Sequence, residues 1–414
     1  MIPNMRLVSC NGLGGSGELG VVQSGFTLVH RTGDLKLGAK GVETNRRTIG
    51  WEWDSYFSPD PGDWKVPRDV DFVYGNPPCS GWSTWSTGKF RGAQSKANDH
   101  IWKFIAYAGR VAPPVVAFEC VQQIFTQGRD FLRDVRAKLE AEAGTQYNLH
   151  HVLHNNATVG GAALRKRYFF VASRVPFGID PPVPDCVPTL FESIGDLEGL
   201  ANTFTAQPYK RDDSWWSSRR RDPRGIVDGH KTLDTPGIRR TLELVHSVEW
   251  RQGEGGTHPL RRYVAEHGRI PESWRYREDK IKEKDYDLGF RQPVRWRYDR
   301  PALTATGAIL DLVIHPTEDR TLTHREAARI QGWPDTWHLE PTKGVATMKV
   351  THGKGVPVDA GRWLGTWVRR SLEGRPGSMN GAPDLLGDRE FVMRMDQEHK
   401  LPLKEKKRRS VMWA

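Results

Sequence analysis

Four side chains between residues 79 and 167 carry groups suited to covalent and acid–base chemistry. Cys79 lies in GNPPCSGWS, where two prolines stiffen the loop that presents its thiol, a potential nucleophile. Glu119 follows the apolar run VVAF, where removal from water favours the protonated carboxyl group, a potential acid. Arg165 and Arg167 are two residues apart and would point the same way from a strand edge. Together they supply a nucleophile, an acid and two positive charges.

Each of these features also has an ordinary explanation. A single cysteine is more often a small buried hydrophobe than a nucleophile. A carboxylate at a strand end can be exposed, and surface arginines at this spacing are common. The glycine-rich segment NGLGGSGELG (11–20) would let the backbone approach a ligand at a helix N-terminus, but such a segment is often only a turn. The case for a site therefore depends on whether the fold brings these segments together.

The hydrophobic pattern predicts the elements that must position these segments. Short apolar runs predict buried strands over 6–10, 71–74, 115–118 and 167–172. Apolar residues at i, i+3, i+4 and i+7 predict helices near 101–108 and 131–139. This alternation indicates an α/β core with a mostly parallel sheet and helices on both faces. Ligands bind beyond the carboxyl ends of such strands. We expect the glycine-rich segment, the Cys79 loop, the Glu119 segment and the arginine segment there.

A different composition begins near residue 174. Proline, glycine, arginine and tryptophan replace the periodic pattern there, which predicts a second, loop-rich domain. Regular structure returns near residue 300. Further along, Thr323 and Glu326 form a capping box before a predicted helix that ends at Gly332. A final helix is expected over 358–372. We therefore expect a core at 1–173, a second domain at 174–310, a return to the core at 311–372 and a basic tail at 373–414.

The charge of the chain favours a polyanionic partner. The 414 residues have a formal net charge of +11 and a pI near 9.5, although solubility alone would also explain this excess. Arginines alternate with aromatic residues in SWWSSRRRDPRG, WRYR and VRWRY, a mixture suited to phosphates and bases. We therefore expect nucleic acid rather than an acidic small molecule as the partner.

Composition also indicates where the protein works. No apolar run is long enough to cross a bilayer, and the N-terminus lacks the order of a secretory signal. The four cysteines, Cys10, Cys79, Cys120 and Cys186, form no CxxC pair. We expect a cytoplasmic monomer with reduced thiols, no metal site and no membrane partner.

Taken together, these segments resemble the cytosine-C5 DNA methyltransferase family of bacterial or phage type, over almost the whole chain. The most specific match is PPCSGWS followed by ECV and then by GGAALRKR. The segments RPALTAT (300–306), IHPTEDRTLTHREAARIQGWP (314–334) and GKGVP (353–357) follow after a variable middle. The resemblance implies a Rossmann-like methyltransferase core that uses S-adenosylmethionine, with a smaller target-recognition domain.

The resemblance implies a role for each of the four side chains. Cys79 attacks C6 of cytosine, because C5 alone is a poor nucleophile and the adduct makes it an enamine carbon. Glu119 in its acid form hydrogen-bonds N3, while Arg165 and Arg167 steady the base and the adduct. The target nucleotide must be flipped out of double-stranded DNA. The candidate DNA contacts are Ser83, Arg219, Arg220, Arg221, Arg295, Arg297 and Thr304.

The donor site follows from the same resemblance. Gly12, Gly14 and Gly15 would admit the amino-acid end of S-adenosylmethionine. An acidic residue after a strand would hold the ribose hydroxyls, with Glu43 as first choice and Glu52 as its rival. The other candidate donor contacts are Cys10, Asn11, Trp53, Asn76, Pro78, Lys354 and Val356.

The chain departs from the family pattern mainly on the donor side. Val8, Ser9 and Cys10 stand where the family has Asp-Leu-Phe, so the aromatic residue expected over the adenine is missing. Trp51 or Trp53 would replace it. Ala163 stands in place of a glutamine ahead of the two arginines.

Lys354 replaces an asparagine that lies near the donor's reactive carbon in the family. Its ammonium would repel the sulfonium of the donor unless the side chain turned to solvent or lost its proton. Alternatively, the ammonium would pair with the carboxylate of carboxy-S-adenosylmethionine, and the product would be 5-carboxymethylcytosine.

Two further functions remain open from the sequence. A non-catalytic DNA-binding protein on the same scaffold would explain the charge and the second domain, but it would not need both Cys79 and Glu119. An RNA cytosine methyltransferase would share the chemistry and differ in its substrate.

Overall fold

The computed structural model describes residues 4–12, 14–34, 54–83, 91–180, 187–209, 220–232, 234–248, 258–286, 292–304, 309–339 and 355–378. Contacts divide the chain into two compact units. Of the described residues, the first unit contains 4–161, 165–180, 187 and 355–378, and the second contains 162–164 and 188–339. Each unit has hydrophobic cores of its own.

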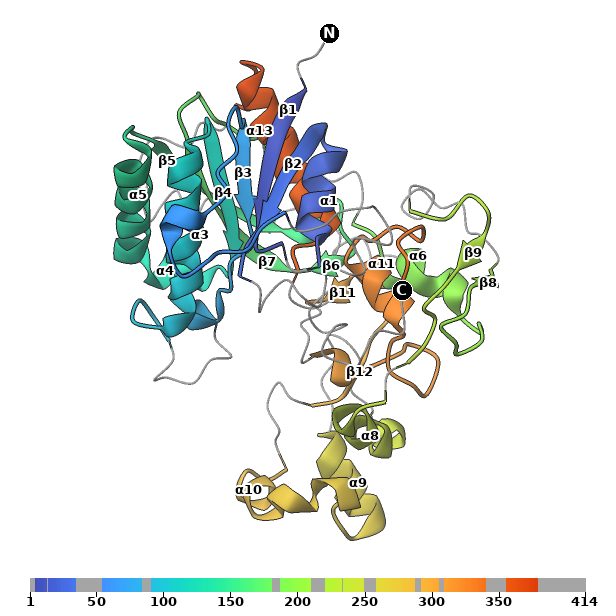
Figure 1. Ribbon diagram of the computed structural model, residues 1–414. Helices are drawn as coiled ribbons and strands as arrows, with labels where there is room; N and C mark the ends of the chain where they lie inside the picture. Colours follow the sequence, from blue (N-terminus) through green and yellow to red (C-terminus); the bar gives the residue numbers. More distant parts are fainter. Residues whose placement is uncertain are drawn as a thin grey trace. The chain divides into compact units, whose positions relative to one another are not determined.

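A six-stranded sheet forms the centre of the first unit, in the order β2-β1-β3-β4-β7-β5 (Figure 1). Its strands are β1 (Met5–Cys10), β2 (Phe26–Thr32), β3 (Phe72–Gly75), β4 (Val115–Cys120), β5 (Asn148–Asn155) and β7 (Lys166–Ser173). β1 to β4 pair in parallel, whereas β7 is antiparallel to both β4 and β5. The predicted α/β fold with a mostly parallel sheet is confirmed.

All four strands predicted from apolar runs are present, as β1, β3, β4 and β7. The sequence analysis missed β2 and β5, because polar residues interrupt their apolar pattern. His30 and Arg31 are buried in β2, and β5 contains three buried histidines, His150, His151 and His154. Polar side chains in a buried strand conceal the run that sequence analysis looks for.

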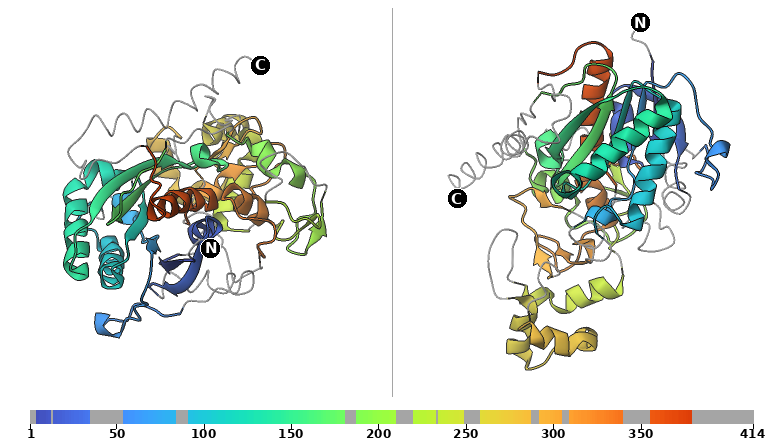
Figure 2. Two further views of the ribbon diagram at one scale, coloured as in Figure 1. Left: turned by 90° about the horizontal axis from the view of Figure 1, so that it is seen from above. Right: turned by 90° about the vertical axis from the view of Figure 1, so that its left-hand side faces the viewer.

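The two faces of the sheet carry separate cores because successive strand residues point to opposite sides. Val8, Val73 and Val116 pack on one face, against α3 (Asp99–Val111) and α5 (Arg129–Ala143). Their neighbours Leu7 and Phe72 pack on the other face, with α1 (Ser16–Gln23) and α13 (Val358–Leu372). In the right-hand view of Figure 2, α3 and α5 lie in front of the sheet and α13 behind it. Burial on both faces explains the continuous apolar runs of the central strands.

Several predicted helix features are confirmed. α3 contains the predicted periodic residues 101–108, and α5 those of 131–139. In α11 (His324–Ile330) the Thr323 hydroxyl accepts from the Glu326 amide at 3.2 Å, and the Glu326 carboxylate accepts from the Thr323 amide at 2.8 Å. Gly332 follows this helix with φ 83°. α13 covers the predicted range of residues.

The second unit consists of short elements joined by loops. The helices described in it are α6 (Leu190–Ile194), α8 (Pro236–Glu243), α9 (Pro259–His267), α10 (Glu278–Glu283) and α11. Two-residue strands pair as β6 (Ala163–Leu164) with β11 (Ala302–Leu303), β8 (Gln207–Pro208) with β9 (Ile226–Val227), and β10 (Val294–Arg295) with β12 (Val313–Ile314). This is the loop-rich domain that the composition predicted.

Short helices complete the two units. The first unit also contains α4 (Gln123–Gln127) and the 3-10 turns η1 (Pro61–Asp63), η2 (Ser80–Trp82), η4 (Lys96–Asn98) and η5 (Asn156–Val159). The second contains η6 (Gly195–Leu197), η7 (Val245–Ser247), η8 (Glu272–Arg277) and η10 (Ile309–Asp311).

The structure places the domain boundaries differently from the sequence analysis. Residues 174–180 remain with the first unit, and residues 311–339 pack within the second, so the chain rejoins the first unit only at Gly355. Both apolar packing and ion pairs hold α11 in the second unit, since Ala327 and Ile330 share a core cluster with Leu190. α11 is anchored in the second unit by Arg329, whose guanidinium lies 2.5 Å from Asp196 and 2.7 Å from Asp335. Hydrophobic periodicity does not report such buried ion pairs.

Candidate active site

The sheet brings the predicted catalytic segments to one edge. β1, β3 and β4 end at this edge, and β7 begins there because it runs in the opposite direction. Glu119 pairs in register with Phe169, and Cys120 with Tyr168, so Arg167 lies beside the end of β4. The predicted convergence at the carboxyl ends of the strands therefore includes the arginine segment, which precedes its strand.

Glu119 is at the centre of this cluster and is 1% exposed. Asn76 donates a hydrogen bond from Nδ2 to Oε2 of Glu119 at 3.0 Å. The Nε atom of Arg167 and an Nη atom of Arg165 lie 3.1 and 3.9 Å from Oε1. The apolar run VVAF predicted this carboxyl group just past a strand, with removal from water favouring its protonated form. In the structure it lies inside β4, and two guanidinium groups lie beside it.

The two arginines differ in exposure. The side chain of Arg165 is 3% exposed, whereas that of Arg167 is 14% exposed. Burial lowers the pKa of Arg165 to about 9, with a further contribution from the neighbouring Arg167 charge. Arg165 remains a cation at neutral pH, because this value is still well above 7.

Cys79 is half-buried at the residue that precedes η2. Its carbonyl oxygen accepts a hydrogen bond from the Trp82 amide at 3.0 Å, and the Gly81 carbonyl accepts from the Gly92 amide at 2.7 Å. These two hydrogen bonds fix the conformation of the loop that presents the thiol. A hydrogen bond with the Cys120 thiol lowers the pKa of Cys79; Arg167 acts in the same direction, against burial and the Glu119 charge. A lowered pKa increases the fraction of reactive thiolate.

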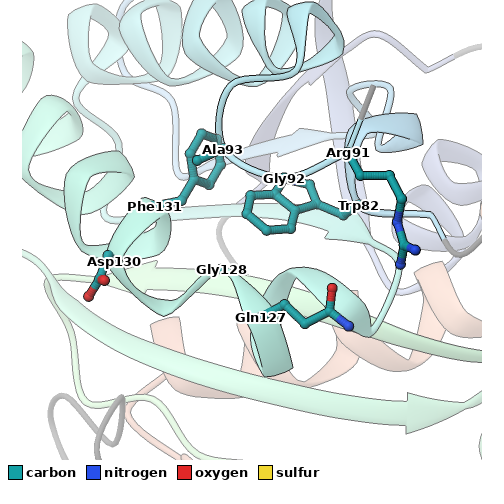
Figure 3. A pocket seen from close by; sticks show the side chains of 8 residues that line it. All are labelled: Trp82, Arg91, Gly92, Ala93, Gln127, Gly128, Asp130 and Phe131. Atoms are coloured by element: carbon teal, nitrogen blue, oxygen red, sulfur yellow. The ribbon is translucent and has the colours of Figure 1, made fainter. Parts of the chain in front are cut away.

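A cavity of about 560 Å³ lies beside this loop (Figure 3). Trp82 and Phe131 form its apolar wall, with ring centroids 5.3 Å apart. Arg91, Gln127 and Asp130 supply its polar side chains. Cys79 and Glu119 do not line it, so the cavity is adjacent to the Cys79 loop rather than part of the cluster.

The glycine-rich segment forms a tight turn between β1 and α1. Gly15 has φ 90° and its amide donates to the Gly12 carbonyl at 2.6 Å. Asn11 is fully buried with φ 55°, an unusual conformation for a residue other than glycine. Within the described residues its Nδ2 atom has no hydrogen-bond partner. A buried donor without a partner at this turn is suited to a ligand.

Asp34 is a residue at this turn that the sequence analysis missed. It follows β2 by two positions, and its amide donates to Oδ1 of Asn11 at 2.9 Å. Its carboxylate lies 3.7 Å from Nδ1 of His100 and 3.9 Å from the ammonium of Lys103. The signal was the apolar run FTLV followed by Gly33 and Asp34, a second strand with an acidic residue at its end.

Other expected donor contacts have different surroundings. The Cys10 side chain is buried in the core, and burial raises the pKa of its thiol. Only its backbone reaches the turn region, where its carbonyl accepts from the Asn76 amide at 3.1 Å. Asn76 uses its side-chain amide to hold Glu119, Pro78 is half-buried before the nucleophile, and Val356 is 1% exposed against α1. Glu43, Glu52, Trp51, Trp53 and Lys354 lie outside the described residues.

Several of the predicted DNA contacts are buried or bonded within the second unit. The Arg221 side chain is fully buried, with Nε 2.6 Å from Asp196, so it stabilises the interior of the second unit. Arg220 is 8% exposed. Arg295 bonds the carbonyl oxygens of His315 and Glu318 at 2.8 and 3.0 Å. A segment such as SSRRRD has no hydrophobic period, so its sequence does not show which of its arginines are buried.

The remaining predicted contacts are mixed. Arg297 is paired with Asp299 at 2.6 Å, and the Thr304 hydroxyl donates to the Leu164 carbonyl at 2.6 Å. Ser83 is half-buried at the end of η2, and Arg219 lies outside the described residues.

An exposed aromatic residue in the second unit fits DNA better than the buried arginines do. Tyr276, in the predicted WRYR segment, is 62% exposed. The guanidinium groups of Arg277 and Arg240 lie 5.2 and 5.5 Å from the centre of its ring. An exposed ring flanked by two cations can stack on a base while the arginines contact phosphates.

The described part of the chain shows neither a candidate metal site nor a candidate membrane-spanning helix. No group of three or more His, Cys, Asp or Glu side chains there could hold a metal ion. None of the helices described is both long and apolar enough to cross a bilayer.

Known proteins with similar sequences are methyltransferases. Residues 55–368 match the model of the C-5 cytosine-specific DNA methylase family. The chain is 24% identical to the Type II methyltransferase M.MthTI of Methanothermobacter thermautotrophicus, over 90% of this chain and 99% of that protein. It is 25% identical to the Type II methyltransferase M.DdeI of Desulfomicrobium norvegicum, over 67% of this chain and 66% of that protein.

A solved structure supports the fold. A protein described as a DNA modification methyltransferase encoded within an E. coli prophage superposes with a TM-score of 0.62 and 16% identity, covering 89% of this chain and 100% of that one. The family match includes β3, β4, β7, the Cys79 loop and the arginine segment, which form the cluster around Glu119. The chain therefore belongs to the C-5 cytosine-specific DNA methylase family.

Proposed function

We propose that this protein transfers a methyl group from S-adenosylmethionine to C5 of cytosine in double-stranded DNA, through a covalent adduct on Cys79. One observation carries the proposal. The loop of a thiol with a lowered pKa lies at the same sheet edge as a buried carboxyl group held by Asn76, Arg165 and Arg167. A nucleophile, a group able to exchange a proton and two cations are what addition to a pyrimidine requires.

The first step in this proposal is attack of the Cys79 thiolate on C6. The new S–C6 bond moves the electron pair of the C5–C6 double bond into the ring, and N3 takes a proton from Glu119. C5 becomes an enamine carbon and attacks the donor's methyl carbon, and the bond from that carbon to the donor sulfur breaks, so that S-adenosylhomocysteine leaves. Loss of the C5 proton then restores the C5–C6 double bond and releases the thiolate, while the proton on N3 returns to Glu119. Arg165 and Arg167 balance the Glu119 charge while its proton is away.

The described residues fit the proposed donor. S-adenosylmethionine supplies a methyl group attached to a sulfonium centre, which makes that carbon electrophilic. The tight turn at Gly12 and Gly15 lets the backbone come close to a ligand, and the buried Nδ2 of Asn11 is a donor suited to its carboxylate or ribose. Asp34 is at the end of β2, where an acidic residue binds ribose hydroxyls in related folds.

The target base must leave the duplex before Cys79 can reach it. Contacts to the DNA backbone would offset the free energy of unstacking and unpairing. Tyr276 with Arg240 and Arg277 is the described group in the second unit that best matches such a contact.

A second candidate for the transferred group follows from Lys354 if its side chain neither turns to solvent nor loses its proton. An ammonium in place of the family's asparagine would pair with the carboxylate of carboxy-S-adenosylmethionine and yield 5-carboxymethylcytosine. Competition between both donors, followed by mass spectrometry of the nucleosides, separates the two products. Exclusive 5-methylcytosine rejects the second donor, whereas a carboxymethyl product should shift back toward methyl in Lys354→Asn.

The same measurement tests the proposed function. Purified protein, S-adenosylmethionine and duplex DNA of mixed sequence should yield 5-methylcytosine, and transfer RNA offered in parallel should not. Label in the RNA alone would favour an RNA methyltransferase. DNA binding without any modified cytosine would favour a non-catalytic protein on the same scaffold.

A further inference from the structure

A buried polar cluster lies beneath the glycine-rich turn. The Ser9 hydroxyl of β1 donates a hydrogen bond to Oε1 of Glu18, in the first turn of α1. Oε2 of Glu18 lies 2.7 Å from an Nη atom of Arg31 in β2. The side chains of Glu18 and Arg31 are 1% and 2% exposed. One carboxylate thus connects the three elements around the turn.

The Glu18 carboxylate lies directly against Gly12. A Cβ atom at Gly12 would be 1.5 Å from Oε1 of Glu18, a distance that no side chain could accommodate. The Gly12 carbonyl accepts the hydrogen bond from Gly15 that closes the turn. The carboxylate therefore packs directly against the backbone at the start of the turn.

Arg31 extends the cluster to a second segment. Its amide donates to the Asp54 carboxylate at 2.6 Å, and its carbonyl accepts from the Asp54 amide at 2.9 Å. In the sequence Asp54 follows Glu52 and Trp53, two of the expected donor contacts. Arg31 therefore connects Glu18, which lies beneath the glycine-rich turn, to Asp54, which adjoins these contacts in the sequence.

The cluster depends on a residue that departs from the family pattern. Ser9 stands where the family has leucine, a side chain that cannot hydrogen-bond a carboxylate. Glu18 and Arg31 form a buried ion pair, so removing either one alone would leave the charge of the other uncompensated. The hydrogen bond from Ser9 to Glu18 is therefore one that the family pattern does not provide.

We propose that Ser9, Glu18 and Arg31 are positioning residues that hold the glycine-rich turn in the conformation that binds the methyl donor. This inference rests on the proposed function. A turn already fixed before binding loses less conformational freedom on association, which increases affinity. The three side chains act through Gly12 and Asp54, so their effect should be on donor binding rather than on the chemical step.

The first test compares two serines that contact α1. Ser9→Ala removes the hydrogen bond to Glu18 and should raise the Kd for S-adenosylhomocysteine about threefold to tenfold, measured by calorimetry without DNA. The kcat at saturating donor should stay within about twofold of wild type, the pattern of lost ground-state binding. Ser24→Ala is the matched control, because that hydroxyl donates to the Val21 carbonyl at 2.6 Å at the opposite end of α1. It should leave the Kd unchanged.

The second test removes both charges together. A single substitution would bury an unpaired charge and unfold the protein for an unrelated reason, whereas Glu18→Leu combined with Arg31→Met replaces the pair by apolar groups. We expect a Kd more than tenfold higher with a melting temperature close to wild type. Leu364→Ala, in the core beneath α13, should lower the melting temperature without the same loss of affinity.

Wild-type affinity in both Ser9→Ala and the double variant would overturn the proposal. Equal weakening by Ser24→Ala, or a loss confined to kcat, would do the same. A wild-type protein that binds neither S-adenosylmethionine nor S-adenosylhomocysteine would overturn the proposed function as well. Normal binding by wild type together with unaffected variants would overturn the role of the cluster alone.

Discussion

The Nε atom of Arg167 lies 3.1 Å from Oε1 of Glu119. The two residues are 48 positions apart by number and meet only because β7 runs antiparallel to β4. Arg167 also helps to lower the pKa of Cys79. This arginine is therefore electrostatically linked to both the proposed acid and the proposed nucleophile.

Replacing Arg167 should damage the chemical step. Arg167→Met leaves the Glu119 carboxylate with Arg165 as its nearest cation, and we expect kcat to fall about 10²- to 10³-fold in single-turnover assays at saturating DNA and donor. Arg174→Met is a control beyond the other end of the same strand, where its guanidinium donates to the Ala112 carbonyl at 2.6 Å. It should keep kcat within about twofold. Similar rates for both variants would remove Arg167 from the site.

Cys79→Ser should abolish turnover while retaining DNA binding. A hydroxyl is not ionised near neutral pH without a strong base, whereas the thiol of Cys79 has a lowered pKa. DNA containing 5-fluorocytosine should trap the wild-type protein, because fluorine at C5 cannot leave as a proton does. The complex is detected as a band stable to denaturing electrophoresis. Active enzyme without such a band would contradict the covalent scheme.

Cys120→Ala should raise the pKa of Cys79, because it removes the hydrogen bond that is the main cause of the lowering. The measurement is the iodoacetamide alkylation rate of the Cys79 peptide as a function of pH. The wild-type midpoint should lie below the ordinary cysteine value of about 8.5, and the variant midpoint should be higher. Ile124→Val, a change in the same core cluster without a titrating group, should leave the midpoint in place. Identical midpoints would show that Cys120 has no influence.

Acid should destabilise the first unit through His151. Burial lowers the pKa of His151 to about 3, so the folded state binds a proton less readily than the unfolded state, whose value is about 6.5. Stability is therefore lost as the pH falls from about 6.5 towards 3, by about 2 kcal/mol at pH 5. His151→Phe keeps a ring beside Phe125 and Tyr168 but cannot titrate. Urea unfolding of this variant should show a smaller loss between pH 6.5 and 5, and an unchanged loss would contradict this.

Arg221 should matter for folding rather than for DNA. Arg221→Met removes one of the two cations on the buried Asp196 carboxylate and should lower the free energy of unfolding by about 3 kcal/mol. Arg224→Met is the exposed control, since that side chain is 71% exposed in its pair with Asp222, and should change little. DNA affinity of folded Arg221→Met should stay within about twofold of wild type. A large loss of affinity with normal stability would return Arg221 to the DNA interface.

The sequence could predict those parts of the site that depend on local patterns. Apolar runs located β1, β3, β4 and β7, and strand ends in a parallel sheet face one edge whatever the details of packing. Cys79 and Glu119 are therefore placed correctly at that edge. The capping box at Thr323 needed only residues within one helical turn, and it is also present.

Local patterns could not show which polar groups are buried together. β2 was missed because His30 and Arg31 interrupt it, and with β2 the acidic Asp34 at its end was missed. For the same reason Arg221 was taken for a surface residue, although Asp196 neutralises it inside the second unit.

The sequence by itself determined the fold class and the family, because these depend on short motifs and on hydrophobic period, and it located the proposed nucleophile in one of those motifs. Tertiary structure decided how charges are compensated. Glu119 meets Arg167 across antiparallel strands, and Glu18 meets Arg31 across a helix and a strand. A buried charge is stable only beside an opposite charge, and that partner can be anywhere along the chain, since only folding brings the two together.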